Sequence, residues 1–257
     1  MTKSTDSPDK SAPLHYWVIV PAAGLGTRMG AEYPKQYLPL AGRAVIEHTL
    51  ERLAQHPLIT EIIVVLAEDD AYWAEIDLRK IPKPVTTTIG GTERCDSVLN
   101  GLKAIESRAN EKDWVLVHDA ARPCVRTTDI EQLISQCKDT DGGLLGIAAK
   151  DTMKLVDDEA YVTQTLNREF IWQAFTPQMF RYRNLLDALE QGKRSSKPIT
   201  DEAMAMELAG YRPKLVFAHT DNIKITMPED LALAEFYLQQ QLEHDTNISG
   251  TDIPDGD

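Results

Sequence analysis

A glycine-rich segment with two nearby cations is the first part of the chain whose residue types could do chemistry. Pro21–Gly30 reads PAAGLGTRMG and directly follows a short β-rich run, Tyr16–Val20. Its small residues let backbone N–H groups approach an anion closely. Arg28 lies inside the segment, and Lys35 follows it. The pattern predicts a loop that holds a phosphate-rich ligand with backbone amides and two positive side chains.

The spacing of the glycines argues against two familiar phosphate-binding loops. A Walker A loop needs G-x-x-x-x-G-K-[ST], and no Lys-Ser or Lys-Thr pair follows these glycines. Gly24, Gly26 and Gly30 form G-x-G-x-x-x-G, which is one residue longer than the dinucleotide fingerprint. A dinucleotide-dependent oxidoreductase is therefore disfavoured, whereas a tight turn without a ligand stays open for the glycines alone.

The cysteines and histidines predict neither a disulfide framework nor a zinc site. Cys95, Cys124 and Cys137 are odd in number and include no C-x-x-C pair, and the six histidines include no H-x-x-x-H pair. This usage fits a reducing cytoplasm, where we expect the protein to be. Asp119 is a better candidate for chemistry, because it follows a strand-like run at the edge where open α/β sheets bind ligands.

The net charge limits the partners of the protein. The 257 residues carry 27 Lys and Arg against 40 Asp and Glu, a net charge of −13, and 42% of them are hydrophobic. Nucleic acids and anionic membranes need a basic face, so we expect neither as a partner. No run of apolar residues reaches the roughly 18 to 20 of a membrane-spanning helix. A phosphate-rich ligand must therefore meet cations gathered at one place.

The elements that position these residues alternate between strands and helices. Continuous apolar runs predict buried strands, and spaced apolar residues predict amphipathic helices between them. The expected strands are Tyr16–Val20, Glu61–Ala67, Val85–Ile89, Trp114–Val117 and Gly142–Ala149, with helices at Val45–Gln55 and about Glu93–Ser107. We expect an α/β fold with a mostly parallel sheet and helices on both faces.

The pattern changes after about residue 140. Met153–Thr165 reads as two short strands around an Asp157-Asp158-Glu159 turn, a hairpin that could project from the sheet. Further expected elements are helices at about Pro177–Gln191 and Thr200–Ala209, strands at Lys214–Ala218 and Asn222–Thr226, and a final helix from Pro228. Leu231, Ala234, Leu238 and Leu242 give that helix one apolar stripe.

Composition divides the chain into one domain and two tails. Residues 1–14 are polar with no apolar region typical of a signal peptide, and we expect them to be disordered. Residues 15–242 are expected to form a single domain, with the arm at about 150–170. Residues 243–257 contain five acidic residues and no Lys or Arg, and we expect a disordered acidic tail. The chain ends soon after the last expected helix, so we expect no second, fused domain.

Several blocks together resemble the 2-C-methyl-D-erythritol 4-phosphate cytidylyltransferase family over about residues 16–242. The first are Pro21–Gly30 with Pro34–Leu38 (PKQYL), a pattern shared with many nucleotidyltransferases. The others follow in the family's order: Gly90–Leu99 (GGTERCDSVL), Val117–Pro123 (VHDAARP), Asp151–Lys154 (DTMK), Thr200–Ala203 (TDEA) and Asp221–Asp230 (DNIKITMPED). The HDAARP and DNIK-x-T-x-PEDL stretches are the most specific.

The resemblance implies a fold and a reaction. It implies a Rossmann-like nucleotidyltransferase fold with a projecting β-hairpin arm that reaches across a homodimer. The implied reaction is attack of a phosphate-monoester oxygen on the α-phosphorus of CTP, with Mg²⁺ as cofactor and pyrophosphate as leaving group. The nucleophile needs no general base, because a phosphate monoester with a second pKa of about 6 is already largely dianionic at pH 7.

The resemblance also implies roles for individual residues. Arg28 and Lys35 would be the catalytic cations on the triphosphate. Substrate-positioning roles fall on Thr152, Arg168, Thr200, Lys224, Arg122 and Asp119, and Asp119 would also contact the metal, which the CTP phosphates mainly hold. CTP-binding roles fall on Ala22, Ala23, Gly24, Gly26, Gly91, Thr92, Ser97 and Ala120. Asn167 precedes Arg168 where the family often has Asp.

Alternatives remain for the function and for single residues. A cytidylyltransferase for another polyol phosphate, such as ribitol 5-phosphate, shares much of the pattern, and a catalytically silent nucleotide-binding protein could keep the fold. Thr200 could be a helix N-cap, since it stands just before Asp201-Glu202. Arg122 could pair with a carboxylate, and Ser97 could be structural. His118 is expected to be oriented by neighbouring backbone, and the cysteines to be packing residues.

Overall fold

The structure, a computed structural model, describes residues 13–24, 33–194 and 198–249, with backbone alone for residues 244–249. The strands are β1 (Tyr16–Pro21), β2 (Pro39–Leu40), β3 (Arg43–Ala44), β4 (Ile59–Leu66), β5 (Val85–Ile89), β6 (Trp114–Val117), β7 (Gly143–Ala148), β8 (Lys154–Val156), β9 (Val162–Thr165), β10 (Trp172–Arg181) and β11 (Lys214–Phe217). The α-helices are α1 (Val45–Ala54), α2 (Arg94–Ala104), α3 (Thr127–Cys137), α4 (Tyr182–Arg194), α5 (Glu202–Leu208) and α6 (Glu229–Ser249), and Lys35–Tyr37 forms a short 3₁₀ helix.

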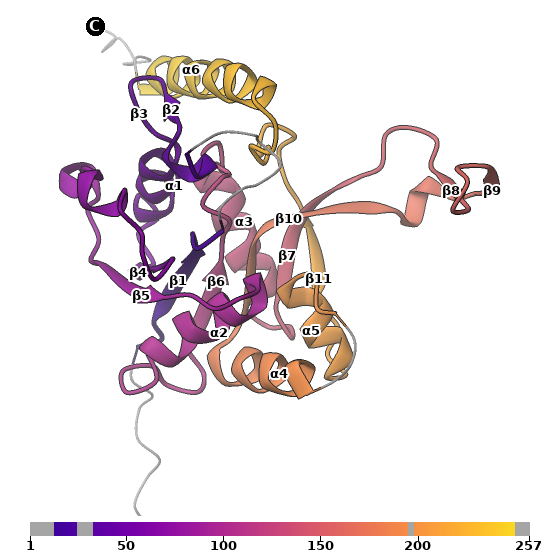
Figure 1. The fold of residues 1–257 in the computed structure, drawn as a ribbon, viewed down its shortest axis with the longest axis horizontal. Helices are drawn as coiled ribbons and strands as arrows, with labels where there is room; N and C mark the ends of the chain where they lie inside the picture. The colour runs from indigo at the N-terminus through magenta and orange to yellow at the C-terminus, as the bar shows by residue number, and fades with distance from the viewer. Residues whose placement is uncertain (1–12, 25–32, 195–197, 250–257) are drawn as a thin grey trace, which may run out of the picture.

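A central sheet of seven strands organises the described part of the chain. Its order is β11-β7-β10-β6-β1-β4-β5 (Figure 1). The pairs of β1 with β4 and β6, of β4 with β5, and of β11 with β7 are parallel, whereas β10 pairs antiparallel with both of its neighbours. The predicted α/β class with a mostly parallel sheet is therefore confirmed.

Both faces of the sheet are covered by helices. Successive residues of a strand point to opposite faces, so β1 contributes Val18 and Val20 to one cluster and Trp17 and Ile19 to another. The first cluster includes apolar residues of α1 and α3, and the second those of α2, α4 and α5 (Figure 1). Burial on both faces explains why β1 reads as a continuous apolar run rather than an alternating one.

The carboxyl ends of the parallel strands meet at one edge of the sheet. The chain passes from β1 to β4 and β5 on one side and returns to β6 on the other side of β1. Such a reversal of strand order leaves a crevice between the two strands, where open α/β sheets bind ligands. Residues 22–24, the described start of the glycine-rich segment after β1, and Asp119, which follows β6, both lie at this crevice.

The predicted arm is present. Strands β8 and β9 pair antiparallel and project away from the body of the molecule between β7 and β10 (Figure 1). A backbone hydrogen bond of 2.8 Å from Ala149 N to Ile171 O closes the base of the arm. The arm leaves the molecule without an apolar core of its own.

The predicted helix at Pro177–Gln191 is wrong in its first part. Residues 172–181 form β10, and the helix α4 begins only at Tyr182. The helix was predicted to begin at Pro177 because proline is favoured in the first turn of a helix. The register of β10 against β7 is irregular between Ala174 and Gln178, and this is where a strand accommodates a proline such as Pro177.

Three other features of the fold differ from the expectations. Helix α3, which buries Ile130, Leu133 and Ile134, was not predicted. The segment 222–226 is not a strand. Helix α6 continues to Ser249, so the expectation of disorder from residue 243 is wrong for 243–249. Residues 1–12 and 250–257 lie outside the described residues.

A buried carboxylate ties the amino-terminal ends of the central strands together. Asp113, which is fully buried, accepts hydrogen bonds from Trp17 Nε1 at 3.0 Å, His15 N at 3.0 Å and Asn110 N at 2.9 Å. Burial raises the pKa of the Asp113 carboxyl, but the hydrogen bonds from Trp17, Asn110 and His15 outweigh it and set this pKa below its usual value.

No helix of the described residues is long and apolar enough to cross a membrane.

We predict that Asp113→Asn lowers the free energy of unfolding by about 2–3 kcal/mol at pH 7, because hydrogen bonds to a charged acceptor are lost. The folded-state pKa lies below the unfolded value of about 3.9, so the carboxylate stabilises the fold above that pH. Its contribution disappears as the pH falls through the folded-state pKa. The difference between the two proteins, measured by urea unfolding, should therefore shrink below about pH 4.

The exposed Asp158 on the arm provides the matched control. Asp158→Asn should change the free energy of unfolding by less than about 0.5 kcal/mol. An equal loss for both variants would contradict the role given to Asp113.

Candidate active site

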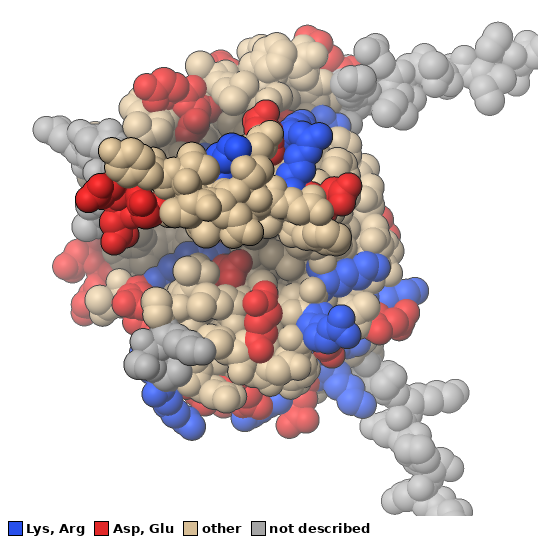
Figure 2. All heavy atoms as spheres, turned by 90° about the vertical axis from the view of Figure 1, so that its right-hand side faces the viewer, with Lys and Arg blue, Asp and Glu red and all other residues tan. Residues whose placement is uncertain are grey.

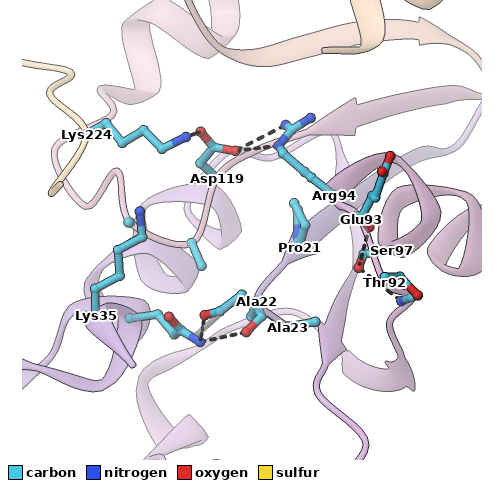
Figure 3. A pocket seen from close by; sticks show the side chains of 15 residues that line it. Pro21, Ala22, Ala23, Lys35, Thr92, Glu93, Arg94, Ser97, Asp119 and Lys224 are labelled. Atoms are coloured by element: carbon cyan, nitrogen blue, oxygen red, sulfur yellow. Dashed lines mark hydrogen bonds and ion pairs between the residues drawn. The ribbon is translucent and has the colours of Figure 1, made fainter. Parts of the chain in front are cut away.

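A cleft opens at the carboxyl edge of the sheet, and most of the predicted site residues line it. The loops after β1, β5 and β6 form its floor, and Lys35 and Lys224 reach it from outside the sheet (Figure 3). Its described lining consists of Pro21, Ala22, Ala23, Gly24, Lys35, Gln36, Gly91, Thr92, Glu93, Arg94, Ser97, Asp119, Ala120, Ala121 and Lys224. Two predicted residues, Gly26 and Arg28, lie outside the described residues.

A buried glutamine holds the start of the glycine-rich segment. The side chain of Gln36 donates from Nε2 to Ala22 O at 2.6 Å and to Gly24 O at 3.4 Å. Ala22 N continues the ladder of the sheet by donating to Val65 O at 2.8 Å. Because Gln36 follows Lys35 directly, the same contacts set the position of that lysine. Gln36 belongs to the PKQYL block, but its residue type alone predicted no role for it.

Close packing at Gly90 brings the β5–α2 loop against the glycine-rich segment. A Cβ atom on Gly90 would lie 2.6 Å from Ala23 Cβ and 2.8 Å from Ser97 Oγ, so only glycine fits. Ser97 Oγ accepts from Gly91 N at 3.2 Å and donates to Glu93 O at 3.3 Å. The hydroxyl of Ser97 therefore holds the β5–α2 loop in shape, which is the structural role that was the alternative for this residue. Ser97 also lines the cleft.

Asp119 is the centre of the charges in the cleft. Its Oδ2 lies 2.8 Å from Lys224 Nζ and 3.7 Å from Arg122 Nε, and its Oδ1 accepts from Arg94 Nε at 3.1 Å (Figure 3). Burial raises the pKa of Asp119, but the charges of Arg94, Lys224 and Arg122 outweigh it and hold that pKa far below its usual range. Asp119 is therefore ionised throughout the physiological range.

Arg94 is a residue of the cleft that the sequence analysis did not single out. It donates from Nη1 to Glu202 Oε1 at 2.6 Å and from Nη2 to Glu202 Oε2 at 3.1 Å, in addition to its contact with Asp119. Glu202, in the first turn of α5, is fully buried. The sequence feature that could have identified Arg94 is its place at the start of a predicted helix. The helix dipole disfavours a cation there unless acidic side chains bind it.

The cleft is cationic although the protein is acidic. Lys35, Arg94 and Lys224 in its lining and Arg122 behind it bring four positive charges, against the three negative charges of Glu93, Asp119 and Glu202. On the face shown in Figure 2, by contrast, Lys and Arg side chains lie among Asp and Glu without a broad basic patch. The local excess suits a small polyanion.

Arg122 lies behind the cleft rather than in its lining. It is 7% exposed, donates from Nη1 to Asn222 O at 2.7 Å, and stacks on Phe175 with 4.8 Å from its Cζ to the ring centroid. With Asp119 as its ion-pair partner, Arg122 follows the carboxylate-pairing alternative of the sequence analysis.

Three predicted residues are absent from the described lining of the cleft in their own chain. Thr152 and Arg168 are exposed on the arm, where Arg168 Nη1 donates to Lys150 O at 2.5 Å. Thr200 is exposed before α5, and its Oγ1 contacts Met204 Sδ at 3.4 Å. The N-cap alternative for Thr200 is wrong, because Asp201 caps the helix by accepting from Met204 N at 2.9 Å.

The nearby histidine and cysteines are not suited to nucleophilic chemistry. Burial lowers the pKa of His118 to about 4, so its ring is neutral at pH 7, and Nε2 lies 3.1 Å from Arg122 O. Burial also raises the pKa of Cys124 to about 12, which keeps its thiol protonated. The backbone contact of His118 confirms the expected orientation by neighbouring backbone.

The described residues offer a metal ion little beyond Asp119. No group of three or more His, Cys, Asp or Glu side chains within the described ranges could hold a metal ion. Mg²⁺ in nucleotide sites is commonly held by one or two carboxylates together with substrate phosphates. A single ionised carboxylate beside a cleft for a polyanion fits that arrangement.

Comparisons with known proteins agree on one family. The family model described as IspD: 2-C-methyl-D-erythritol 4-phosphate cytidylyltransferase matches residues 16–240. The protein of that name from Tolumonas auensis is 49% identical over 227 residues, which cover 88% of this chain and 97% of that relative. The one from Hahella chejuensis is 50% identical over 230 residues, covering 89% and 95%.

Solved structures support the same assignment. The 2-C-methyl-D-erythritol 4-phosphate cytidylyltransferase of Francisella tularensis superposes with a TM-score of 0.74 at 36% identity, covering 87% of this chain and 99% of that one. The 4-diphosphocytidyl-2C-methyl-D-erythritol synthase of Anaerococcus prevotii gives a TM-score of 0.77 at 31% identity, covering 88% and 96%. Fold, cleft and sequence lead to one conclusion: the chain belongs to the IspD family of 2-C-methyl-D-erythritol 4-phosphate cytidylyltransferases.

Proposed function

We propose that this chain transfers CMP from CTP to 2-C-methyl-D-erythritol 4-phosphate in non-mevalonate isoprenoid precursor biosynthesis. The products are 4-diphosphocytidyl-2-C-methyl-D-erythritol and pyrophosphate. The observation that carries the proposal is the cationic cleft at the carboxyl ends of β1, β5 and β6, in a chain of this family. Its residues Lys35, Asp119 and Lys224 match the family blocks in type and order.

The main barrier to this reaction is electrostatic. A dianionic phosphate must approach the α-phosphorus of a triphosphate, and no base is needed to activate it. Preorganised cations stabilise the charge that develops as the bridging bond to pyrophosphate breaks. Lys35 at the glycine-rich segment serves this role, together with Arg28 by its resemblance to the family's loop.

Substrate phosphate binds on the side of the cleft formed by Lys224. The Lys224 ammonium is held 2.8 Å from Asp119 Oδ2, so it is oriented before a ligand arrives. A side chain that is already in place loses less freedom on binding than a mobile one. Asp119 itself orients hydroxyl groups of ribose and substrate, and Arg122 keeps the carboxylate in position from behind.

CTP binds along the glycine-rich segment and the β5–α2 loop. The backbone of Ala22, Ala23, Gly24 and Ala120 lines the cleft on the triphosphate side, and we place Gly26 there by resemblance. Gly91, Thr92 and Ser97 lie at the far end, where backbone groups and hydroxyls can read the cytosine edge. Small residues on both sides allow backbone N–H groups to contact the nucleotide directly.

Mg²⁺ is the proposed cofactor, held by Asp119 and mainly by the phosphates of CTP. When bound, it would neutralise phosphate charge and align the triphosphate. The ionised state of Asp119, which its three cationic neighbours maintain, keeps an oxygen ligand for the metal available at neutral pH.

A homodimer completes the proposed site. Thr152 and Arg168 belong to the arm and lie away from their own cleft, although their resemblance places them at the substrate phosphate. Tyr161, Val162 and Phe170 on the arm are 68%, 59% and 80% exposed, which is unusual for apolar side chains without a partner surface. These observations support an arm that packs against a second copy and supplies residues to its cleft.

We place the enzyme in the cytoplasm, in agreement with its free cysteines.

Pyrophosphate release by the purified protein tests the reaction. With CTP, Mg²⁺ and 2-C-methyl-D-erythritol 4-phosphate we expect steady turnover, and with ribitol 5-phosphate very little. The reverse preference would assign the chain to the other polyol phosphate. Tight CTP binding without turnover of either substrate would identify a silent nucleotide-binding protein.

Replacement of Lys35 tests the catalytic cation. We expect Lys35→Ala to lower kcat by about 10²- to 10³-fold, the usual effect of removing a preorganised charge from a transition state. The melting temperature should stay near that of the wild type. Lys112→Ala, which removes an exposed lysine before β6 at the opposite end of the sheet, is the matched control and should leave kcat unchanged. A near wild-type rate for Lys35→Ala would refute the role.

Mixing two inactive variants tests the arm. If the cleft of one subunit uses Arg168 of its neighbour, a heterodimer of Lys35→Ala and Arg168→Ala subunits contains one intact site. Equal mixing after dissociation should therefore restore about a quarter of the wild-type rate, since half of the dimers are mixed and each has one of two sites intact. No recovery in a sample shown to contain heterodimers would mean that the arm serves its own subunit.

A further inference from the structure

Three buried polar side chains lie directly behind the cleft. His118 follows β6, Thr176 lies within β10, and Asn222 follows β11. Their exposed fractions are 0%, 4% and 0%, and the described lining of the cleft includes none of them. Burying polar groups lowers stability unless each finds a hydrogen-bond partner, so their arrangement needs an explanation.

Two of these side chains, Thr176 and His118, form a continuous chain of hydrogen bonds that begins at Asp119. Asp119 N donates to Thr176 Oγ1 at 3.1 Å, and Thr176 Oγ1 lies 3.0 Å from His118 Nδ1. At the other side of the ring, His118 Nε2 lies 3.1 Å from Arg122 O. The ring and the hydroxyl therefore connect the two ends of the segment from Asp119 to Arg122.

The contacts leave only one arrangement of hydrogens. Arg122 O can only accept, so His118 Nε2 carries the hydrogen, and the neutral ring then accepts at Nδ1. Thr176 Oγ1 must donate its hydrogen to Nδ1, which leaves its lone pairs for the N–H of Asp119. Every member of the chain is satisfied, with a single direction from Asp119 through Thr176 and His118 to Arg122.

A second branch extends the network to the other cations. Asn222 Nδ2 donates to Thr176 O at 2.8 Å, and Asn222 O accepts from Arg122 Nη1 at 2.7 Å. Ile225 N donates to Ala121 O at 2.8 Å, so the segment that carries Lys224 is held against the segment that carries Asp119. Thr176 thus connects with two of the segments whose side chains form the ion pairs: the one that carries Asp119 and Arg122 and the one that carries Lys224.

We propose that Thr176 and His118 are positioning residues for catalysis, which hold Asp119 and Arg122, and with them the ion pairs of the cleft, in the reactive arrangement. The inference rests on the proposed function, because it assigns to these two side chains a part in the same reaction. Neither side chain touches substrate; both act through the backbone and the carboxylate of Asp119.

The physical reason is the sensitivity of a polyanion site to small displacements. Removing a hydrogen-bond partner that orients a metal-binding side chain commonly lowers metal affinity or activity by about 10- to 100-fold, and we expect an effect of the same size for the partners of Asp119. Without the Thr176 hydroxyl, the N–H of Asp119 and the Nδ1 of His118 would both lose their partner. Asp119 and the cations bound to it could then move by about an ångström, which is enough to lower kcat.

A matched pair of substitutions tests the proposal. Thr176→Val removes the hydroxyl and retains a β-branched side chain, and Thr176→Ser retains the hydroxyl. We expect Thr176→Val to lower kcat by about 10- to 100-fold with little change in KM for CTP, because the loop around Gly91 and Ser97 is untouched. Thr176→Ser should keep kcat within about threefold, since its hydroxyl still makes both hydrogen bonds. Thermal unfolding of both variants reports any general loss of stability.

Equal kcat values for the Val and Ser variants would overturn the proposal. So would a loss in Thr176→Val that is explained by a smaller folded fraction at the assay temperature. The ¹⁵N chemical shifts of the His118 ring in the wild type give a readout independent of folding defects in a variant. We expect a protonated Nε2 and an unprotonated Nδ1 at neutral pH; the opposite tautomer would contradict the chain even if Thr176→Val failed to fold.

The same measurements separate this proposal from the proposed function. The wild type is first assayed with both polyol phosphates, and the variants are compared on the one that it accepts. If the wild type accepts neither, the proposed function fails. The positioning role then fails with it. If the wild type is active but Thr176→Val and Thr176→Ser have equal kcat values, the proposed function stands and only the positioning role is refuted.

Discussion

Asp119 carries a buried negative charge that Arg94 and Lys224 neutralise from two distant segments and Arg122 from its own segment. A buried charge without its partners is strongly destabilising, so these segments must meet in one arrangement for the fold to be stable. The same ion pairs hold the cations where a phosphate can reach them. Folding and substrate recognition therefore depend on one electrostatic constraint, and the acidic remainder of the surface leaves the cleft as the place for a small polyanion.

The parallel sheet makes that arrangement possible. Strands β1, β5 and β6 end at the same edge, so the loops that follow them converge without long connections. Antiparallel β10 passes between β6 and β7 and brings Thr176 beneath Asp119. At the opposite edge Asp113 joins the amino-terminal end of β1 to the segment that leads into β6.

Much of the fold and of the cleft could be predicted from local patterns. Continuous apolar runs identified β1, β4 and β6, because their burial on both faces leaves a strong signal in the sequence. Strand β10 was missed because Pro177 suggested a helix start, and only pairing with two neighbours makes its segment a strand. Among site residues, Lys35 and Asp119 were found through their motifs. Arg94 was missed because its acidic partner Glu202 is 108 positions away.

Local sequence patterns were enough to identify the family, the reaction type and the residues of the glycine-rich segment and of the block after β6. Those features depend on residue types at short spacing, which a linear pattern records. Three features became visible only in the folded chain: Arg122 packs behind the carboxylate, Asp201 rather than Thr200 caps α5, and Thr152 and Arg168 lie away from their own cleft. These facts depend on distances between segments far apart in the chain, and such distances follow from packing rather than from spacing along the sequence.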